Sequence, residues 1–281
     1  MKVIANVLLM VCFSLRLIAQ DECDNQVKAD LLDAYLLSKL EVTKLNATIF
    51  YRGIDDTQNH VAGFFPIKEG GIYKCIYWRA DPVPEIYATV SLTEPADIAT
   101  AVLDTTVRQF NDEEAAAFRI CDAAFIDFGR NMDLSQFPKP TYTSFIPLIS
   151  KQGKRVYVDY RADRTDRMLF GNDVVYTFDD GDRIISRVKA HKKGTEIVFA
   201  DRTAGLAKYG KWFHSHEYDA LEGVSVADLA TVFLYSTRYM GHRFLIKDRR
   251  FIYMLDLGRE VKVSIYTHAN YDKIFGDTNA D

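Results

Sequence analysis

Two histidines, a serine and an aspartate lie close together in the C-terminal third of the chain, at a spacing that could bind a metal ion. The segment GKWFHSH contains His214 and His216, and SVAD then contributes Ser225 and Asp228. Side chains alternate along a β-strand, so histidines at i and i+2 share a face and can reach one ion. Two imidazoles and one carboxylate leave a fourth position open, as in catalytic zinc sites. The spacing therefore predicts a Zn²⁺ site formed by His214, His216 and Asp228.

A simpler interpretation of the same residues stays open. Ser225 and Asp228 have the spacing of a capping box, with aspartate in place of the usual glutamate or glutamine. An acid in the first turn is also favoured by the helix dipole. The residues that follow predict a helix lying on a core, because its apolar positions recur at helical spacing: Val226, Leu229, Ala230, Phe233 and Leu234. On this interpretation the histidines are coincidental, within an unrelated secreted α+β protein.

The stretch resembles the JAMM metalloprotease signature of the MPN (JAB) domain family. In that family a strand with G-W-x-H-S-H-P is followed by a loop and by S-x-x-D at the start of a helix. The resemblance implies that His214, His216 and Asp228 bind zinc and that Ser225 helps to stabilise the oxyanion. It also implies strands after the helix, of the type seen in RFLIK and RFIYMLDL. The expected activity is zinc-dependent hydrolysis of a peptide or isopeptide bond in a peptide or protein substrate.

The sequence departs from the family pattern next to the histidines. Glu217 stands where the family has proline, and the loop between His216 and Ser225 holds eight residues where seven are usual. These departures keep a second function open. The domain could be a catalytically inactive MPN-like module that binds a protein partner, with or without metal.

The family also uses an upstream glutamate as general base. Between residues 138 and 213 the only glutamate is Glu196, in the strand-like segment TEIVFA. Glu196 is therefore the predicted base, which moves the proton during hydrolysis. Asp163 and Asp166 are the shorter alternatives.

Upstream, the pattern predicts an α+β unit. Leucines at helical spacing in residues 24–45 predict a helix. Strand-like runs separated by turn residues then predict an antiparallel meander: ATIFYRG, HVAGFFPI, IYKCIYWRA and EIYATVSL. Asn111 and Glu114 predict the N-cap and N3 positions of a second helix. A stripe of core-packing residues runs along that helix, namely Phe118, Cys121, Phe125 and Phe128.

The segment MDLSQFPKPTYTS contains two prolines and is the best candidate for a domain boundary. The predicted organisation is an N-terminal α+β domain of unknown function at 21–137, a JAMM/MPN-like α/β domain at 138–270 and a tail at 271–281. Hairpin turns are expected at KQGK and DDGD.

The first 20 residues resemble a secretory signal peptide, with Lys2 before a short apolar run. Its removal would leave a secreted or envelope protein, periplasmic in a bacterium, with no further transmembrane span. The net charge of −4 and the mixing of acids and bases indicate no nucleic-acid partner.

Three cysteines lie outside this segment, so at most one internal disulfide can form among Cys23, Cys75 and Cys121. Free thiols are an equally good interpretation. Asn46-Ala47-Thr48 is a glycosylation sequon, which has meaning only in a eukaryotic secretory pathway.

Overall fold

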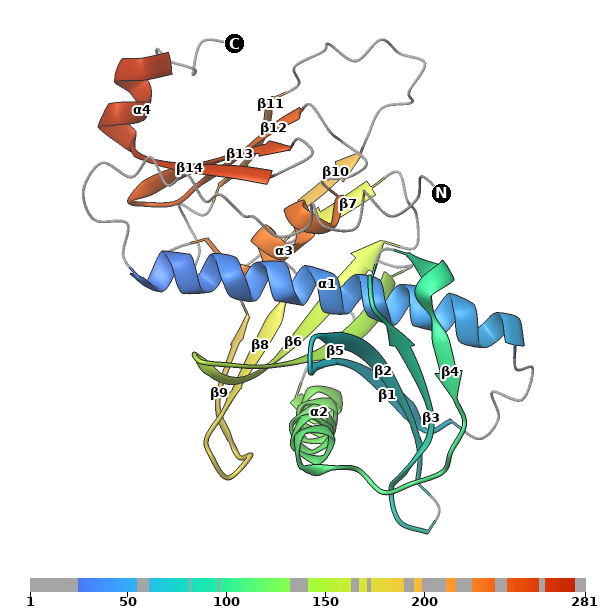
Figure 1. The fold of residues 1–281 in the computed structure, drawn as a ribbon. Coiled ribbons are helices and arrows are strands. Elements are labelled where there is room, and N and C mark those ends of the chain that lie inside the picture. The colour runs from blue at the N-terminus through green and yellow to red at the C-terminus, as the bar shows by residue number, and fades with distance from the viewer. Residues whose placement is uncertain are drawn as a thin grey trace, which may run out of the picture. The chain divides into compact units, whose positions relative to one another are not determined.

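A computed structural model shows a mixed α+β protein, as the sequence predicts (Figure 1). It describes residues 25–54, 61–80, 82–95, 97–131, 141–162, 167–170, 173–189, 195–198, 211–215, 224–235, 242–257 and 261–275. For some of these residues, His214 and Glu196 among them, the backbone is described and the side chain is not. The signal-like segment 1–20 lies outside the described residues.

The chain divides into two compact units, which are described separately. The larger unit comprises residues 29–199 and 225–234, and the smaller unit comprises residues 1–28, 200–224 and 235–281. This division falls elsewhere than the sequence-based boundary between residues 137 and 138.

The larger unit begins with a long helix and a four-stranded antiparallel sheet. Helix α1 (Asn25–Ile54) is followed by strands that lie side by side in the order in which they occur in the sequence: β1 (Gly63–Glu69), β2 (Ile72–Arg79), β3 (Glu85–Leu92) and β4 (Val102–Asp104). A short 3-10 helix, Ile98–Thr100, precedes β4. The three strand-like runs after residue 60 are confirmed as β1, β2 and β3.

The strand predicted for ATIFYRG is wrong, because residues 47–53 continue α1. Ala47 and Tyr51 lie one helical turn apart, and both are buried against Cys75 and Tyr77 of the first sheet. Packing on the sheet therefore decides the structure of this segment against its β propensity.

Helix α2 (Asp112–Asn131) begins with the predicted capping box. The Asn111 side-chain oxygen accepts the Glu114 N–H at 2.9 Å, and the Glu114 carboxylate accepts the Asn111 N–H at 3.0 Å. Cys121 and Phe128 of the predicted stripe are buried. Phe125 is not, since its side chain is 62% exposed.

A second four-stranded antiparallel sheet follows, in the order β5-β6-β8-β9. Its strands are β5 (Thr141–Ser150), β6 (Gly153–Ala162), β8 (Val174–Phe178) and β9 (Ile184–Lys189). The predicted turns at KQGK and DDGD join β5 to β6 and β8 to β9, with Gly153 and Asp182 at positive φ. Strands β7 (Arg167–Phe170) and β10 (Thr195–Val198) form a separate antiparallel pair.

One hydrophobic core joins the residues on both sides of the predicted boundary. Successive residues of β2 point to opposite faces of the first sheet, so Cys75 and Tyr77 pack with α1 whereas Ile76 packs with α2. The cluster around α2 also includes Val158 of β6 and Tyr176 of β8. In Figure 1, α1 and α2 accordingly lie on opposite faces of the first sheet.

The smaller unit contains a mixed sheet in the order β11-β12-β13-β14. Its elements are β11 (Lys211–Ser215), β12 (His242–Lys247), β13 (Phe251–Leu257), β14 (Val261–Thr267) and α4 (His268–Phe275). Strand β11 is parallel to β12, and the other pairs are antiparallel. Tyr271 of α4 is buried beside Leu245 and Met254, so the segment predicted as a tail from residue 271 begins inside a packed helix. Among the described residues, none of the helices has the length and apolar character needed to cross a membrane.

Candidate metal centre

The strand that carries the first histidine forms as predicted. Strand β11 pairs with β12 in a register that sets His214 opposite Ile246. Its partner β12 forms a hairpin with β13, which confirms the strand pair expected after the motif. His216 and the loop that follows it lie outside the described residues, as does the side chain of His214.

The helix that carries the other two motif residues, α3 (Val226–Tyr235), also forms where the sequence predicts it. The Oγ atom of Ser225 accepts the N–H of Asp228 at 3.0 Å, and the Ser225 carbonyl accepts the N–H of Leu229 at 3.2 Å. Ser225 is therefore an N-cap, as one of the two interpretations requires. Four residues of the predicted apolar stripe are buried and the fifth, Leu234, is half-buried. The ring of Phe233 meets Tyr35 of α1 edge to face, with 6.3 Å between the ring centroids.

The burial of Asp228 is unusual for a capping acid. Aspartates of a first helical turn are commonly solvated, whereas Asp228 is 1% exposed. A carboxylate taken out of water needs polar, cationic or metal partners to remain ionised. Burial thus gives Asp228 the environment of a ligand or a buried cap, rather than that of a surface residue.

The donor set fits zinc by its chemistry. Imidazole nitrogens and a carboxylate oxygen are ligands that Zn²⁺ accepts, and three of them leave one position for a substrate or water. The histidines belong to the smaller unit or to undescribed residues, and Ser225 and Asp228 belong to the larger unit. Convergence of His214, His216 and Asp228 therefore stays a prediction. Among the residues that the structure describes, no three His, Cys, Asp or Glu side chains are grouped to hold an ion.

Glu196, the predicted base, lies in strand β10 opposite Leu169 of β7. This confirms the strand predicted for TEIVFA, but the Glu196 side chain is not among those described. Asp163 and Asp166 lie outside the described residues. The role of Glu196 as a base stays a prediction.

A buried ionic network in the larger unit has no counterpart in the sequence analysis. Asp33 of α1 is 5% exposed, accepts a bond from Ser150 at 3.2 Å, and pairs with Arg155 of β6 at 3.3 Å. Arg155 also donates to the Tyr157 hydroxyl at 3.3 Å. Burial raises the pKa of Asp33, and Arg155 opposes that rise. Ser150 and Arg155 are more than 100 positions from Asp33 in the chain, so no local spacing could have revealed these contacts.

The described cysteines are free thiols in separate cores. Cys75 lies on the α1 side of the first sheet, and Cys121 lies in α2 on the other side. Burial raises the pKa of both thiols, that of Cys75 to about 12. Cys23 lies outside the described residues. No disulfide joins Cys75 to Cys121, as the free-thiol interpretation expects.

The glycosylation sequon lies within α1. The side-chain amide of Asn46 donates to the Pro95 carbonyl at 2.6 Å, so the folded chain already uses the nitrogen that a glycan would occupy.

Comparison with known proteins identifies no relative. No protein-family model, no curated protein and no solved structure matches the chain.

Proposed function

We propose that the protein is an exported zinc-dependent hydrolase of amide bonds, with His214, His216 and Asp228 as metal ligands. The observation that carries this proposal is the burial of Asp228 at the first turn of α3, three residues after a capping serine. The strand, helix and hairpin formed around the motif support it, because each occurs at the position that the JAMM/MPN resemblance implies.

The proposed roles follow from the donor set and from the cap. Zinc, when bound, would act as a Lewis acid that polarises a carbonyl and lowers the pKa of water toward neutrality. Ser225 accepts the Asp228 N–H through Oγ, and a hydroxyl that accepts a bond still has its hydrogen to donate. Ser225 would donate that hydrogen to the oxyanion of a peptide or isopeptide substrate. Glu196 would accept a proton and return it to the leaving amine.

The second candidate is an inactive MPN-like module that binds a protein partner. Glu217 in place of the family's proline, next to His216, favours this function. The two candidates differ in whether the protein hydrolyses a substrate, whereas both are compatible with metal binding.

Zinc content of the purified mature protein tests the proposed ligands. We expect about one zinc per chain, as three protein ligands with an open position require. His214→Ala and Asp228→Ala should each lose the metal, whereas the control His191→Ala, in the basic segment KAHKKG, should keep it. A folded wild-type protein without zinc after zinc supplementation would overturn the zinc hydrolase and leave the binding module.

A further inference from the structure

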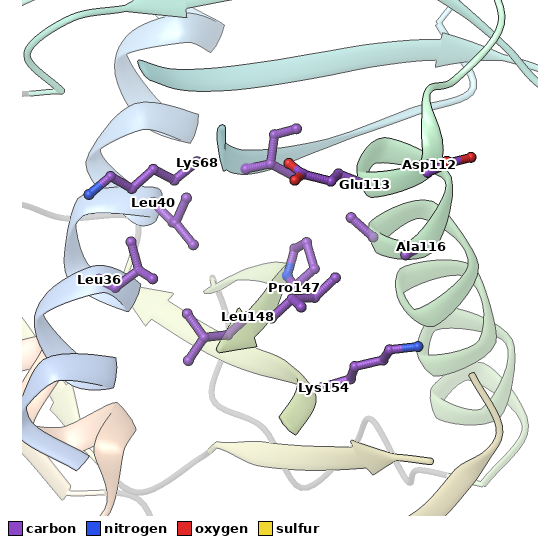
Figure 2. A pocket seen from close by; sticks show the side chains of 12 residues that line it. Leu36, Leu40, Lys68, Asp112, Glu113, Ala116, Pro147, Leu148 and Lys154 are labelled. Carbon is purple, nitrogen blue, oxygen red and sulfur yellow. The ribbon is translucent and has the colours of Figure 1, made fainter. Parts of the chain in front are cut away.

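A cavity opens in the larger unit between α1, β1, α2, β5 and β6 (Figure 2). Its volume is about 400 Å³, within the range of small-molecule sites in proteins. Asp228, the proposed zinc ligand whose side chain is described, is not among its lining residues.

The walls of the cavity are mainly apolar. Leu36 and Leu40 of α1 line one side, and Leu148 of β5 lies between α1 and α2 (Figure 2). Ala116 of α2 lines the opposite side and leaves space because its side chain is a single methyl group. An apolar ligand body would be removed from water here, which favours binding in proportion to the area buried.

Two lysines at the rim are already engaged. The Nζ atom of Lys154 donates to the Asp182 carboxylate at 2.5 Å and to the Asp180 carbonyl at 2.9 Å. The Nζ atom of Lys68 lies 5.1 Å from the centroid of the Tyr73 ring, and Figure 2 shows this ammonium turned away from the cavity. Neither lysine is therefore well placed to bind an anionic ligand in the cavity.

Glu113 is the charged residue that faces the cavity. Figure 2 shows its carboxylate extending over the opening from the first turn of α2, whereas the Asp112 carboxylate points away. Glu113 forms no hydrogen bond or ion pair with any residue that the structure describes. The helix dipole is enough to account for an acid in the first turn of a helix, so the position of Glu113 in α2 does not by itself indicate a ligand. What distinguishes Glu113 is its direction, toward a mainly apolar cavity whose two lysines are engaged by other groups.

We propose that this cavity binds a small organic cation with an apolar body and an ammonium head. The body would pack between Leu40 and Leu148, and the head would pair with Glu113. This inference is independent of the proposed zinc site and of hydrolysis.

Calorimetric titration of the full mature chain tests whether the cavity prefers a positively charged ligand to a negatively charged one. Tryptamine, 2-phenylethylamine and hexylamine are compared with carboxylates of similar apolar body: 3-indolepropionate, 3-phenylpropionate and heptanoate. We expect each amine to bind about tenfold more tightly than its carboxylate, a difference of about 1.4 kcal/mol. The proposal is overturned if no amine binds, or if the carboxylates bind equally well.

Substitutions in the first turns of α2 test the position. Glu113→Gln should weaken amine binding about tenfold, and its neighbour Asp112→Asn should change it less than about twofold. Ala116→Leu should weaken binding of every probe, because the larger side chain occupies part of the cavity. If Glu113→Gln and Asp112→Asn weaken amine binding equally, the amines respond to the overall negative charge of the first turn of α2. That result would overturn the proposed site. That pair decides the question even if Ala116→Leu fails to fold.

Discussion

The Oγ atom of Ser225 accepts the backbone N–H of Asp228 at 3.0 Å, and both residues are nearly inaccessible to solvent. One serine thus fixes the start of α3 and the backbone of the proposed carboxylate ligand. Capping and metal binding are compatible roles for this pair, because the cap uses the backbone N–H of Asp228 and not its carboxylate.

Replacement of the cap should destabilise the larger unit. Ser225→Ala removes the acceptor of the Asp228 N–H and should cost about 1 kcal/mol of unfolding free energy. Thermal unfolding followed by circular dichroism measures this, with Ser225→Thr as the control that keeps a hydroxyl. Equal melting temperatures for Ser225→Ala and the wild type would show that the bond contributes nothing to stability.

Glu196→Gln should separate metal binding from hydrolysis. The substitution leaves His214, His216 and Asp228 intact, so the zinc content should not change. The hydrolytic rate should fall at least about 100-fold if Glu196 is the base, since proton transfer contributes roughly 10²–10⁴-fold to such reactions. The measurement is peptide cleavage by the zinc-loaded protein. An unchanged rate would assign the base to another residue, and Asp163→Asn and Asp166→Asn would be measured next.

The ion pair between the partly exposed Arg108 and the buried Glu114, at the start of α2, should make stability depend on pH in the acid range. Burial raises the pKa of Glu114, but hydrogen bonds from Arg108 and from the Asn111 N–H outweigh it and hold the pKa below its ordinary value. A lowered folded-state pKa stabilises the protein above the unfolded-state pKa, and this stabilisation is lost as the pH falls through the folded-state pKa.

Glu114→Gln should accordingly lower the unfolding free energy by about 1–2 kcal/mol at pH 7, because Arg108 and the Asn111 N–H lose an ionised acceptor while water still reaches part of Arg108. The difference from the wild type should narrow as the pH falls below about 4.5, the ordinary pKa of a glutamate, toward the lower folded-state pKa. Urea unfolding across this pH range measures both effects. The exposed neighbour Glu113 supplies the matched control, and Glu113→Gln should change stability little at any pH. A Glu114→Gln difference that stays constant with pH would contradict the role of ionised Glu114.

A chain of residues 21–137 should not fold alone. Its truncation removes Val156, Val158 and Tyr176 from the cluster that covers Ile120 of α2. Amide hydrogen exchange should show little protection in α2, whereas the full chain should protect it. Protection equal to that of the full chain would support the sequence-based boundary after residue 137.

The sequence alone determined the features that depend on neighbouring residues. The capping box of Asn111 and Glu114, the cap of Ser225 and the turns at Gly153 and Asp182 each involve residues at most a few positions apart. Hydrogen bonds of that range are encoded in local spacing, so these elements could be predicted at the correct positions. The alternation of the strands was visible for the same reason.

Only the tertiary structure decided how segments that are distant in the sequence pack against one another. Burial of Ala47 and Tyr51 against the first sheet made a helix of a segment with strand-like composition. The core around Ile120 joined residues on both sides of the predicted boundary, because hydrophobic packing depends on proximity in space and not on position in the chain. The apolar cavity that Glu113 faces likewise exists because residues of α1 and β5 lie near α2, and no spacing within residues 111–131 specifies that arrangement.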